Sequence, residues 1–379
     1  MGFPLTYKTE SAKGRRLTFS PALFWWGLTV VVLQIVIVSF HLYVWSLRGL
    51  ISVLNTKTTH FSLIILIIST TLTEIVMFYI CARKYSKFLD VSNTLERFDR
   101  SLQLAPPACC MTVTFTTILV VITATPVISH VIHVYLKLKF IKDHEMAIRR
   151  IMTLVCFAVF HCRQICVLAQ FHEVTQSIAK RFRLVKARIR QELIIQSYRQ
   201  SVRRRNPRCI DHRQDSTSST KMNSYMRAYQ MLLDAVDQAN AFYCDLLLGS
   251  VFCKFLDVTA KLFTFYCHLA YERHVSLLII ITTLCHICYL LVVVSSSSDV
   301  TQAADETAPI ICKLINQDLD AGLRKQLETF LMQLAAYNVM FSARGFFQIS
   351  RRMLTTLAAT VTTNLVILIQ FQSQFEESD

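Results

Sequence analysis

The chain has 379 residues, of which 53% are hydrophobic and only 17% are charged, and its seven Gly and seven Pro leave few residues for the turns of a sheet protein. This composition excludes an ordinary water-soluble globular protein and favours a mostly helical membrane protein. We expect no nucleic-acid partner despite the net charge of +15, because the basic residues cluster beside apolar segments, as in cytoplasmic loops.

Seven apolar segments follow one another along the chain, each close to the ~20 residues that a helix needs to cross the hydrocarbon core. The second contains Glu74, and the fourth, which is the least apolar, contains His161 and Arg163. The segments are Ala22–Trp45, Phe61–Cys81, Cys109–Tyr135, Ile151–Phe171, Ala241–Leu269, Val275–Val294 and Ser350–Phe371. The predicted fold is therefore an all-α membrane protein with seven transmembrane helices and cytoplasmic helical extensions.

Lys and Arg are distributed unevenly over the connections between these segments. Residues 1–20, 82–108, 172–240 and 296–349 together carry 27 of them, whereas the connections on the opposite side carry six. Positively charged residues accumulate on the cytoplasmic side of a membrane. The N-terminus is therefore expected in the cytoplasm and the C-terminus outside. A G-protein-coupled receptor has the opposite orientation, and its N-P-x-x-Y and D-R-Y motifs are not found at the corresponding places in this sequence.

Two stretches on the cytoplasmic side have the periodicity of amphipathic helices. Glu173–Tyr198 continues the fourth segment, and 203–220 is then expected to form a flexible loop. Ala308–Met340 is the second such stretch. Both apolar stripes need helices of the same or a neighbouring subunit to cover them. The stripes consist of Val174, Ile178, Phe182, Val185, Ile189 and Leu193, and of Ile311, Ile315, Leu319, Leu323, Leu327, Phe330 and Leu334.

Ionisable residues inside apolar segments are costly in lipid and are expected to face partners or water. Glu74 and Arg163 both lie about 20 Å from the outer ends of their segments, at ~1.5 Å per helical residue. They are therefore candidates for a buried ion pair, which can be purely structural. Lys254, Asp257 and Lys261 share one helix face. That face either pairs internally or contributes to a ligand pocket.

The sequence specifies the walls of a ligand pocket poorly. Depth in the second to sixth segments makes five residues candidates, which are His130, Tyr135, Asp257, His268 and Tyr271. His130 and His133 supply too few ligands for a metal site, and Cys285 and Cys288 are expected to be small packing residues. The sequence shows no catalytic triad and no phosphate-binding loop. We therefore expect no metal, no cofactor and no enzyme activity.

The last apolar segment carries a polar stripe along one face. At about 100° per residue, one line along the helix collects Thr356, Thr360, Thr363, Ile367, Gln370, Phe371 and Gln374. This stripe can hydrogen-bond to neighbouring helices. Alternatively it can line a water-filled pore, in which Ile367 and Phe371 would form an apolar constriction. The pore alternative requires a symmetric oligomer around this helix.

This segment ends with the stretch TTNLVILIQF, residues 362–371. The stretch resembles the C-terminal signature of the insect gustatory receptor family. The signature reads Thr-Tyr, five hydrophobic residues and Gln-Phe. Here Thr363 matches the Thr, residues 365–369 are the five hydrophobic residues, and Gln370 and Phe371 complete the motif, while Asn364 stands where Tyr is usual. Upstream, the stretch FSARGFFQISRRMLTTLAA is also similar to the family's approach to this helix.

The resemblance implies a tastant-gated, non-selective cation channel that conducts monovalent and divalent cations. It implies four subunits, in a homo- or hetero-tetramer with other gustatory receptors, around one pore lined by the seventh helix. It places the gate at Ile367, Gln370 and Phe371, and a tastant pocket on the outer side of each subunit. Leu365 stands where the sugar-receptor branch tends to carry Glu, which favours a bitter or deterrent compound. The implied location is the plasma membrane of a sensory dendrite.

The expected organisation has three parts. Residues 1–300 form a six-helix bundle with the ligand pocket and a basic cytoplasmic loop at 172–240, residues 301–349 form a cytoplasmic anchor helix, and residues 350–379 form the pore helix with an acidic tail. Two other functions stay open, namely a seven-helix receptor that signals through a cytoplasmic partner and a membrane transporter. A transporter is expected to show paired interrupted helices in two repeats, and no such repeat is apparent.

Overall fold

The computed structural model describes residues 6–11, 14–47, 57–103, 113–138, 144–205, 212–267, 269–270, 277–316 and 321–378. The fold is all-α apart from two small antiparallel hairpins, β1–β2 (Thr6–Ser11 and Gly14–Phe19) and β3–β4 (Ser342–Ala343 and Phe347–Gln348). The helices are α1 (Pro21–Leu47), α2 (Lys57–Ser101), α3 (Val113–Leu138), α4 (His144–Arg205), α5 (His212–Cys267), α6 (Leu277–Asp305), α7 (Ala308–Ile315), α8 (Ala321–Ala336) and α9 (Arg351–Ser378).

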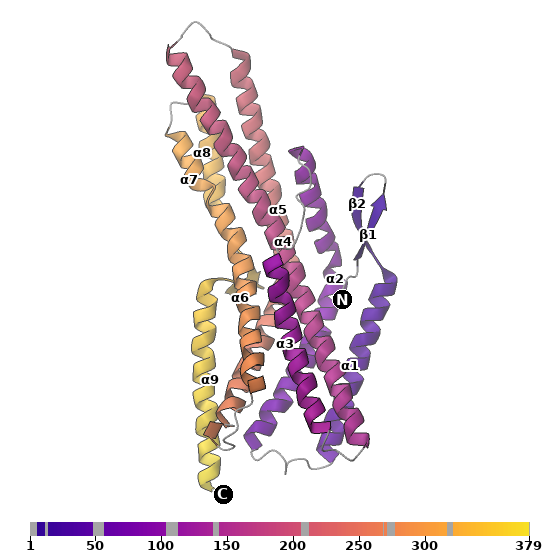
Figure 1. Ribbon diagram of the computed structural model, residues 1–379. Helices are drawn as coiled ribbons and strands as arrows, with labels where there is room; N and C mark the ends of the chain where they lie inside the picture. The colour runs from indigo at the N-terminus through magenta and orange to yellow at the C-terminus, as the bar shows by residue number, and fades with distance from the viewer. Residues whose placement is uncertain are drawn as a thin grey trace.

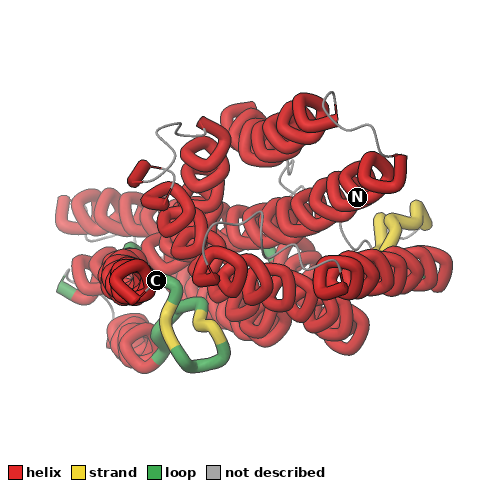
Figure 2. The backbone as a smooth tube through the Cα atoms, turned by 90° about the horizontal axis from the view of Figure 1, so that it is seen from below, coloured by secondary structure: helices red, strands yellow, loops and turns green. Residues whose placement is uncertain are grey.

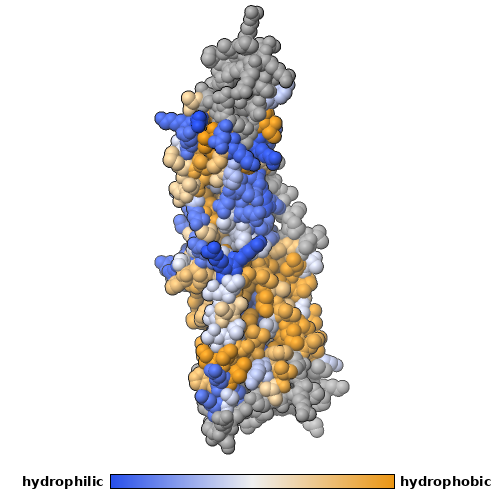
Figure 3. Space-filling view, turned by 90° about the vertical axis from the view of Figure 1, so that its left-hand side faces the viewer, coloured by the Kyte–Doolittle hydropathy of each residue, from blue (hydrophilic) through white to orange (hydrophobic). Residues whose placement is uncertain are grey.

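The helices form an elongated bundle (Figure 1). Helices α4 and α5 run almost its full length, with α7 and α8 beside their upper ends and α9 at one edge of the lower half, next to α6. Seen from below, the two hairpins lie on different sides of the bundle (Figure 2). The hairpin β3–β4 precedes the upper end of α9, whereas the C-terminus lies at the lower end of that helix (Figure 1). Hydrophobic residues gather on the lower part of the surface and polar residues on the upper part (Figure 3). This separation is the one expected of a bundle that lies partly in lipid.

Two helical stretches among the described residues are long and apolar enough to cross a membrane, Ile279–Ile315 and Arg351–Gln374. Shorter apolar helical stretches occur at Phe24–Phe40 and Thr117–Ile132. Length and composition alone are weak grounds for a span, so seven transmembrane helices stay a prediction. The expected domain boundary at residue 300 falls inside α6, which continues to Asp305.

The predicted helix that continues the fourth apolar segment is confirmed. Helix α4 is unbroken from His144 to Arg205, and Ile178, Phe182, Val185 and Ile189 are completely buried along one face of it. Hydrophobic burial at every third or fourth position explains why the helix extends so far beyond the apolar segment.

The prediction of a flexible loop over 203–220 is wrong for most of that stretch. Helix α4 continues to Arg205 and α5 already begins at His212, while 206–211 lie outside the described residues. Ser and Thr have modest helix propensity, but this stretch leads directly into a helix whose Met222, Ala228 and Leu232 are buried. Extending an existing helix adds one hydrogen bond per residue, so tertiary packing overrides the local preference.

The second amphipathic stretch, expected over Ala308–Met340, is divided into α7 and α8, with 317–320 outside the described residues. Pro309 lies in the first turn of α7, where its missing N–H costs nothing. The two helices pack against each other and bury Ile311 and Leu314 of α7 and Leu327 of α8. The apolar stripe is thus covered largely within the subunit.

Buried aromatic side chains connect the long helices to the C-terminal part of the chain. Phe171 of α4 packs edge-on against Tyr243 of α5 and against Phe341, with ring centroids 5.1 and 5.3 Å apart. Higher in the bundle, Tyr229 of α5 lies 5.4 Å from Phe330 of α8. Edge-to-face pairs of this kind add specific geometry to the burial of apolar area. They hold the segment before α9 firmly against α4 and α5.

Candidate functional site

The predicted pair of ionisable residues in the apolar part of the bundle lies together in the structure. Arg163 Nη1 of α4 is 2.9 Å from Glu74 Oε2 of α2, and the two side chains are only 6% and 3% exposed. Each charge compensates the other at a buried position, so removing either side chain would leave a buried charge without a counter-charge.

A second group of ionisable residues joins α4, α5 and α6. We call Lys254, Asp257, Lys261, His286 and His161 the buried polar cluster. Asp257 Oδ2 lies 3.3 Å from Lys254 Nζ and 3.8 Å from His286 Nε2. Lys261 Nζ lies 2.6 Å from His286 Nε2, within hydrogen-bond distance. The rings of His286 and His161 stack with centroids 5.6 Å apart.

The buried polar cluster has more positive than negative groups. It contains two ammonium groups, one carboxylate and two imidazoles. Lys254 also lies over the rings of Phe160 and Tyr289, at 5.2 and 5.5 Å from their centroids, which is a cation–π arrangement. A ligand that brings a hydrogen-bond acceptor or a negative charge would complement this cluster.

The five residues expected to line a pocket occupy different environments. Asp257 belongs to the buried polar cluster, and the half-buried His130 stacks on Phe157 with centroids 4.5 Å apart. Phe157 in turn lies 4.3 Å from His161, so a row of rings leads from His130 to the cluster. Tyr135 is 68% exposed. The remaining two candidates, His268 and Tyr271, lie outside the described residues.

The membership of His161 and His286 in this cluster was not predictable from the sequence. His161 lies in the apolar part of α4 and His286 in α6, and helical periodicity does not show which face of α4 meets which face of α6. Their positions in the apolar segments were a usable signal, because polar residues in such segments tend to face the interior. The contact of Lys261 with His286 depends on how α5 and α6 pack against each other, which is a tertiary feature.

The polar stripe of α9 faces away from the rest of the subunit. Its members Thr356, Thr360, Thr363, Ile367, Gln370, Phe371 and Gln374 are all exposed. Gln372 on the opposite face is buried, Leu357, Val361 and Leu368 toward that face are half-buried, and Met353 in the first turn is buried where the helix leaves the bundle. Helix α9 packs with these inner residues on α5, α6 and α2, and Figure 3 shows the side of the molecule on which α9 lies.

The threonine hydroxyls of the stripe are bonded within α9 itself. Thr356 Oγ1 donates to the Arg352 carbonyl at 3.1 Å, Thr360 Oγ1 to the Thr356 carbonyl at 2.9 Å, and Thr363 Oγ1 to the Ala359 carbonyl at 3.0 Å. These bonds satisfy each hydroxyl donor and leave oxygen lone pairs facing outward. The stripe therefore presents acceptors to whatever surrounds the exposed face.

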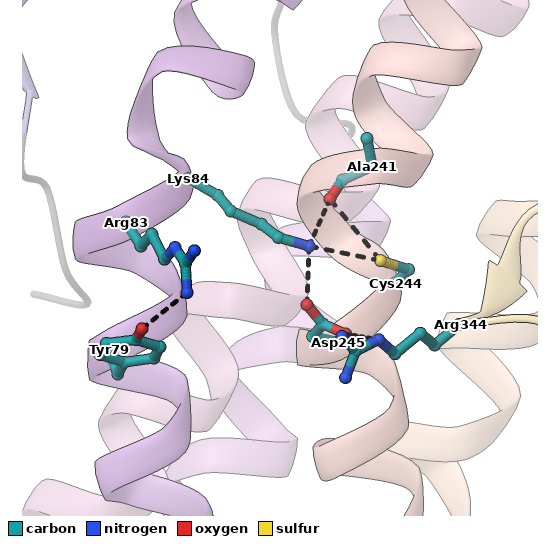
Figure 4. Close-up of polar contacts among 7 residues, drawn as sticks. All are labelled: Tyr79, Arg83, Lys84, Ala241, Cys244, Asp245 and Arg344. Atoms are coloured by element: carbon teal, nitrogen blue, oxygen red, sulfur yellow. Dashed lines mark hydrogen bonds and ion pairs between the residues drawn. The ribbon is translucent and has the colours of Figure 1, made fainter.

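A polar network lies where the hairpin β3–β4 meets α2 and α5 (Figure 4). Lys84 Nζ of α2 is 2.6 Å from Asp245 Oδ2 of α5, and it also donates to the Ala241 carbonyl at 2.9 Å and contacts Cys244 Sγ at 3.7 Å. The other carboxylate oxygen, Asp245 Oδ1, lies 3.2 Å from Arg344 Nε of the hairpin. One carboxylate therefore connects three parts of the chain.

A sequence model described as 7tm chemosensory receptor matches residues 3–375, nearly the whole chain. The chain belongs to the 7tm chemosensory receptor family. Two gustatory receptors of Drosophila melanogaster, 28b and 43a, are each 33% identical to this chemosensory receptor, over 90 and 87 residues. Each match covers 23% of this chain, and 19% and 20% of the two relatives, so the aligned part is about a fifth of their length. The second relative is named as a receptor for sugar taste.

Solved structures show that this chemosensory receptor shares its fold with an insect olfactory receptor. Olfactory receptor OR5 from Machilis hrabei in complex with eugenol superimposes with a TM-score of 0.60, covering 93% of this chain and 90% of that chain at 12% identity. The structure of the same receptor described without a ligand gives the same TM-score at 11% identity. The family model and the gustatory relatives confirm the resemblance to gustatory receptors that the sequence of the last helix indicated.

Proposed function

We propose that this chemosensory receptor is a tastant-gated cation channel, in which four copies surround a central pore lined by α9. The observation that carries the proposal is the outward position of the polar stripe of α9. Hydroxyl and amide groups are poorly accommodated by lipid. Around a shared axis, the same groups would face water and passing ions.

Ile367 and Phe371 would form the gate of this pore, with Gln370 between them. Both apolar side chains are exposed in the single subunit and lie one turn apart. Four copies of each would give an apolar ring that closes by excluding water, and separating the helices would wet the ring and open it. Monovalent and divalent cations are the proposed permeant ions, attracted by carbonyl and amide oxygens along the wall.

The proposed orientation follows the distribution of charge. The upper ends of α4 and α5, with α7 and α8, would be cytoplasmic and would hold the four subunits together. The apolar lower half would contain seven spans, contributed by α1 to α6 and α9, with the C-terminus outside. The proposed location is the plasma membrane of a sensory neuron.

The tastant would bind within each subunit, next to the buried polar cluster. Lys261 and His286 supply a charged donor and an adaptable imidazole at that site. Leu365 argues against a sugar, whereas one relative is named for sugar taste. The proposed ligand is a small organic tastant that carries a hydrogen-bond acceptor. Bitter or deterrent compounds are the class to test first.

A tastant panel on cells that express the chain tests this function. We expect currents that follow tastant addition within milliseconds and persist when G-protein signalling is blocked. Responses that disappear with that block would support a receptor with a cytoplasmic partner instead. Uptake of tastant without current would support a transporter.

Cysteine labelling tests the pore directly. A thiol introduced by Gln370→Cys should react with a membrane-impermeant methanethiosulfonate reagent and reduce the current. A thiol introduced by Leu368→Cys, on the inner face of α9, should not react. The parent chain must be treated in parallel, because Cys162, Cys288 and Cys312 are exposed. Equal labelling of both variants would contradict a pore lined by the stripe.

A further inference from the structure

The hairpin β3–β4 fixes the start of α9 to the bundle. The Ser342 N–H donates to Asn240 Oδ1 of α5 at 3.0 Å. Ser297 Oγ of α6 donates to the Ile349 carbonyl at 3.0 Å. Because α9 begins at Arg351, only two residues after Ile349, any displacement of this hairpin moves the upper end of α9.

The tip of the hairpin has an unusual residue for its backbone conformation. The Phe346 N–H donates to the Ala343 carbonyl at 3.0 Å, and both central residues have positive φ, 52° at Arg344 and 81° at Gly345. Positive φ at both central positions defines a type I′ turn, which favours Asn or Gly at the first of them. An arginine there is conformationally strained. The turn by itself disfavours an arginine at position 344. The contact of its side chain with Asp245 is what this residue adds.

Asp245 divides one negative charge between two cations. Lys84 is 31% exposed and Asp245 is 13% exposed, whereas Arg344 is 69% exposed. The Lys84 contact is shorter and better shielded from water, so it is the stronger of the two. The Arg344 contact is the one that breaks more readily. If α2 moved so that Lys84 lay farther from Asp245, the carboxylate would pair with Arg344 alone and the Arg344 contact would become stronger.

We propose that Asp245 is a positioning residue for gating. When α2 moves relative to α5, the contact between Asp245 and Arg344 of the hairpin becomes stronger or weaker, and the hairpin then holds α9 more or less firmly in place. This inference rests on the proposed channel function. Lys84 and Arg344 compete for Asp245, and the Arg344 contact holds α9 in the closed arrangement. Because the two cations compete, the loss of Lys84 must strengthen the attachment of the hairpin and the loss of Arg344 must weaken it.

Hydrogen–deuterium exchange on the purified full chain in lipid nanodiscs tests the hold on the hairpin without a tastant. Asp245→Asn and Arg344→Gln should both increase amide exchange over residues 341–356. The double variant should exchange no faster than Asp245→Asn alone, because each single variant already removes the contact between Asp245 and Arg344. Arg344 is exposed, so Arg344→Gln is expected to fold even where Asp245→Asn does not.

Lys84→Gln should slow exchange in the same segment, because Asp245 is then available to Arg344 alone. The matched control is Arg83→Gln. Arg83 is the neighbouring residue, and its Nη1 donates to the Tyr79 hydroxyl of its own helix at 2.8 Å, away from Asp245 (Figure 4). This control removes the same charge from the same turn of α2 and should leave the exchange unchanged.

Whole-cell current without tastant supplies the functional measurement. Asp245→Asn and Arg344→Gln should raise this current about three- to fivefold at equal surface expression, the change expected from losing one exposed ion pair. Unchanged exchange and current in these two variants would overturn the proposal, and so would a Lys84→Gln effect in the same direction as theirs. If the parent chain passes no current with any tastant, the channel function fails. The exchange measurements then still decide whether Asp245 holds the hairpin.

Discussion

Arg163 and Glu74, 89 positions apart in the sequence, form an ion pair of 2.9 Å between α4 and α2. Both side chains are buried, so neither charge can turn to water when the other is removed. We predict that Glu74→Gln lowers the free energy of unfolding by about 3–5 kcal/mol, since it leaves a buried guanidinium without a counter-charge. Thermal unfolding of the detergent-purified chain measures this loss.

A double variant separates the pair from the rest of the packing. Glu74→Gln combined with Arg163→Met should recover at least half of the loss, because a buried pair replaced by neutral groups costs much less than half a pair. A single Glu74→Gln variant that melts like the parent chain would show that water or another group already compensates Arg163.

A second buried pair lies in the upper part of the bundle. Both carboxylate oxygens of Asp99 in α2 accept hydrogen bonds from Arg181 in α4. Arg181 Nε donates to Oδ1 at 2.9 Å and Nη2 donates to Oδ2 at 2.6 Å. Asp99→Asn should lower stability by about 3 kcal/mol. The neighbouring Arg100 pairs with Glu96 on the exposed side of the same helix, and Arg100→Gln should cost less than about 1 kcal/mol. Chemical unfolding of both variants gives the comparison, and similar losses would contradict it.

The buried polar cluster predicts a change in tastant sensitivity. Lys261 is hydrogen-bonded to His286, whereas Lys254 is paired with the carboxylate of Asp257, so Lys261 is the cation available to a ligand. Lys261→Met should raise the tastant concentration for half-maximal current about tenfold or more, the effect of losing one charge-assisted hydrogen bond. Concentration–response curves with the most effective tastant measure this shift. Maximal current and surface expression should be retained, and an unchanged curve would remove Lys261 from the site.

Thr360 distinguishes a pore wall from a packing surface. Its hydroxyl is bonded within α9, so Thr360→Val should change the free energy of unfolding by less than about 0.5 kcal/mol. In a pore, the added apolar surface should reduce single-channel conductance. Thr362→Val is the matched control, because Thr362 Oγ1 is bonded in the same way to the Ala358 carbonyl but lies off the stripe. Equal conductance in both variants would contradict a wall formed by the stripe.

Several features of this protein were predictable from local sequence. The apolar segments correspond to helices, and the amphipathic continuation of the fourth segment is present in α4. The Thr363, Gln370 and Phe371 motif indicated the family. Helical periodicity also predicted that Thr356, Thr360 and Thr363 share a face. These features depend on residues a few positions apart, so hydrogen bonding and hydrophobic spacing along one helix are sufficient to determine them.

Other features were decided only by the tertiary structure. The sequence left open whether the stripe of α9 packs against its own subunit, and the burial of Gln372 with the partial burial of Val361 and Leu368 on the other side turns the stripe outward. The helix over 212–220 and the meeting of Lys261 with His286 likewise depend on packing between helices. The Asp245 network joins residues from α2, α5 and a hairpin more than 90 positions further on. Each helix can bury its apolar face in several rotations, and only the packing of all of them together selects one.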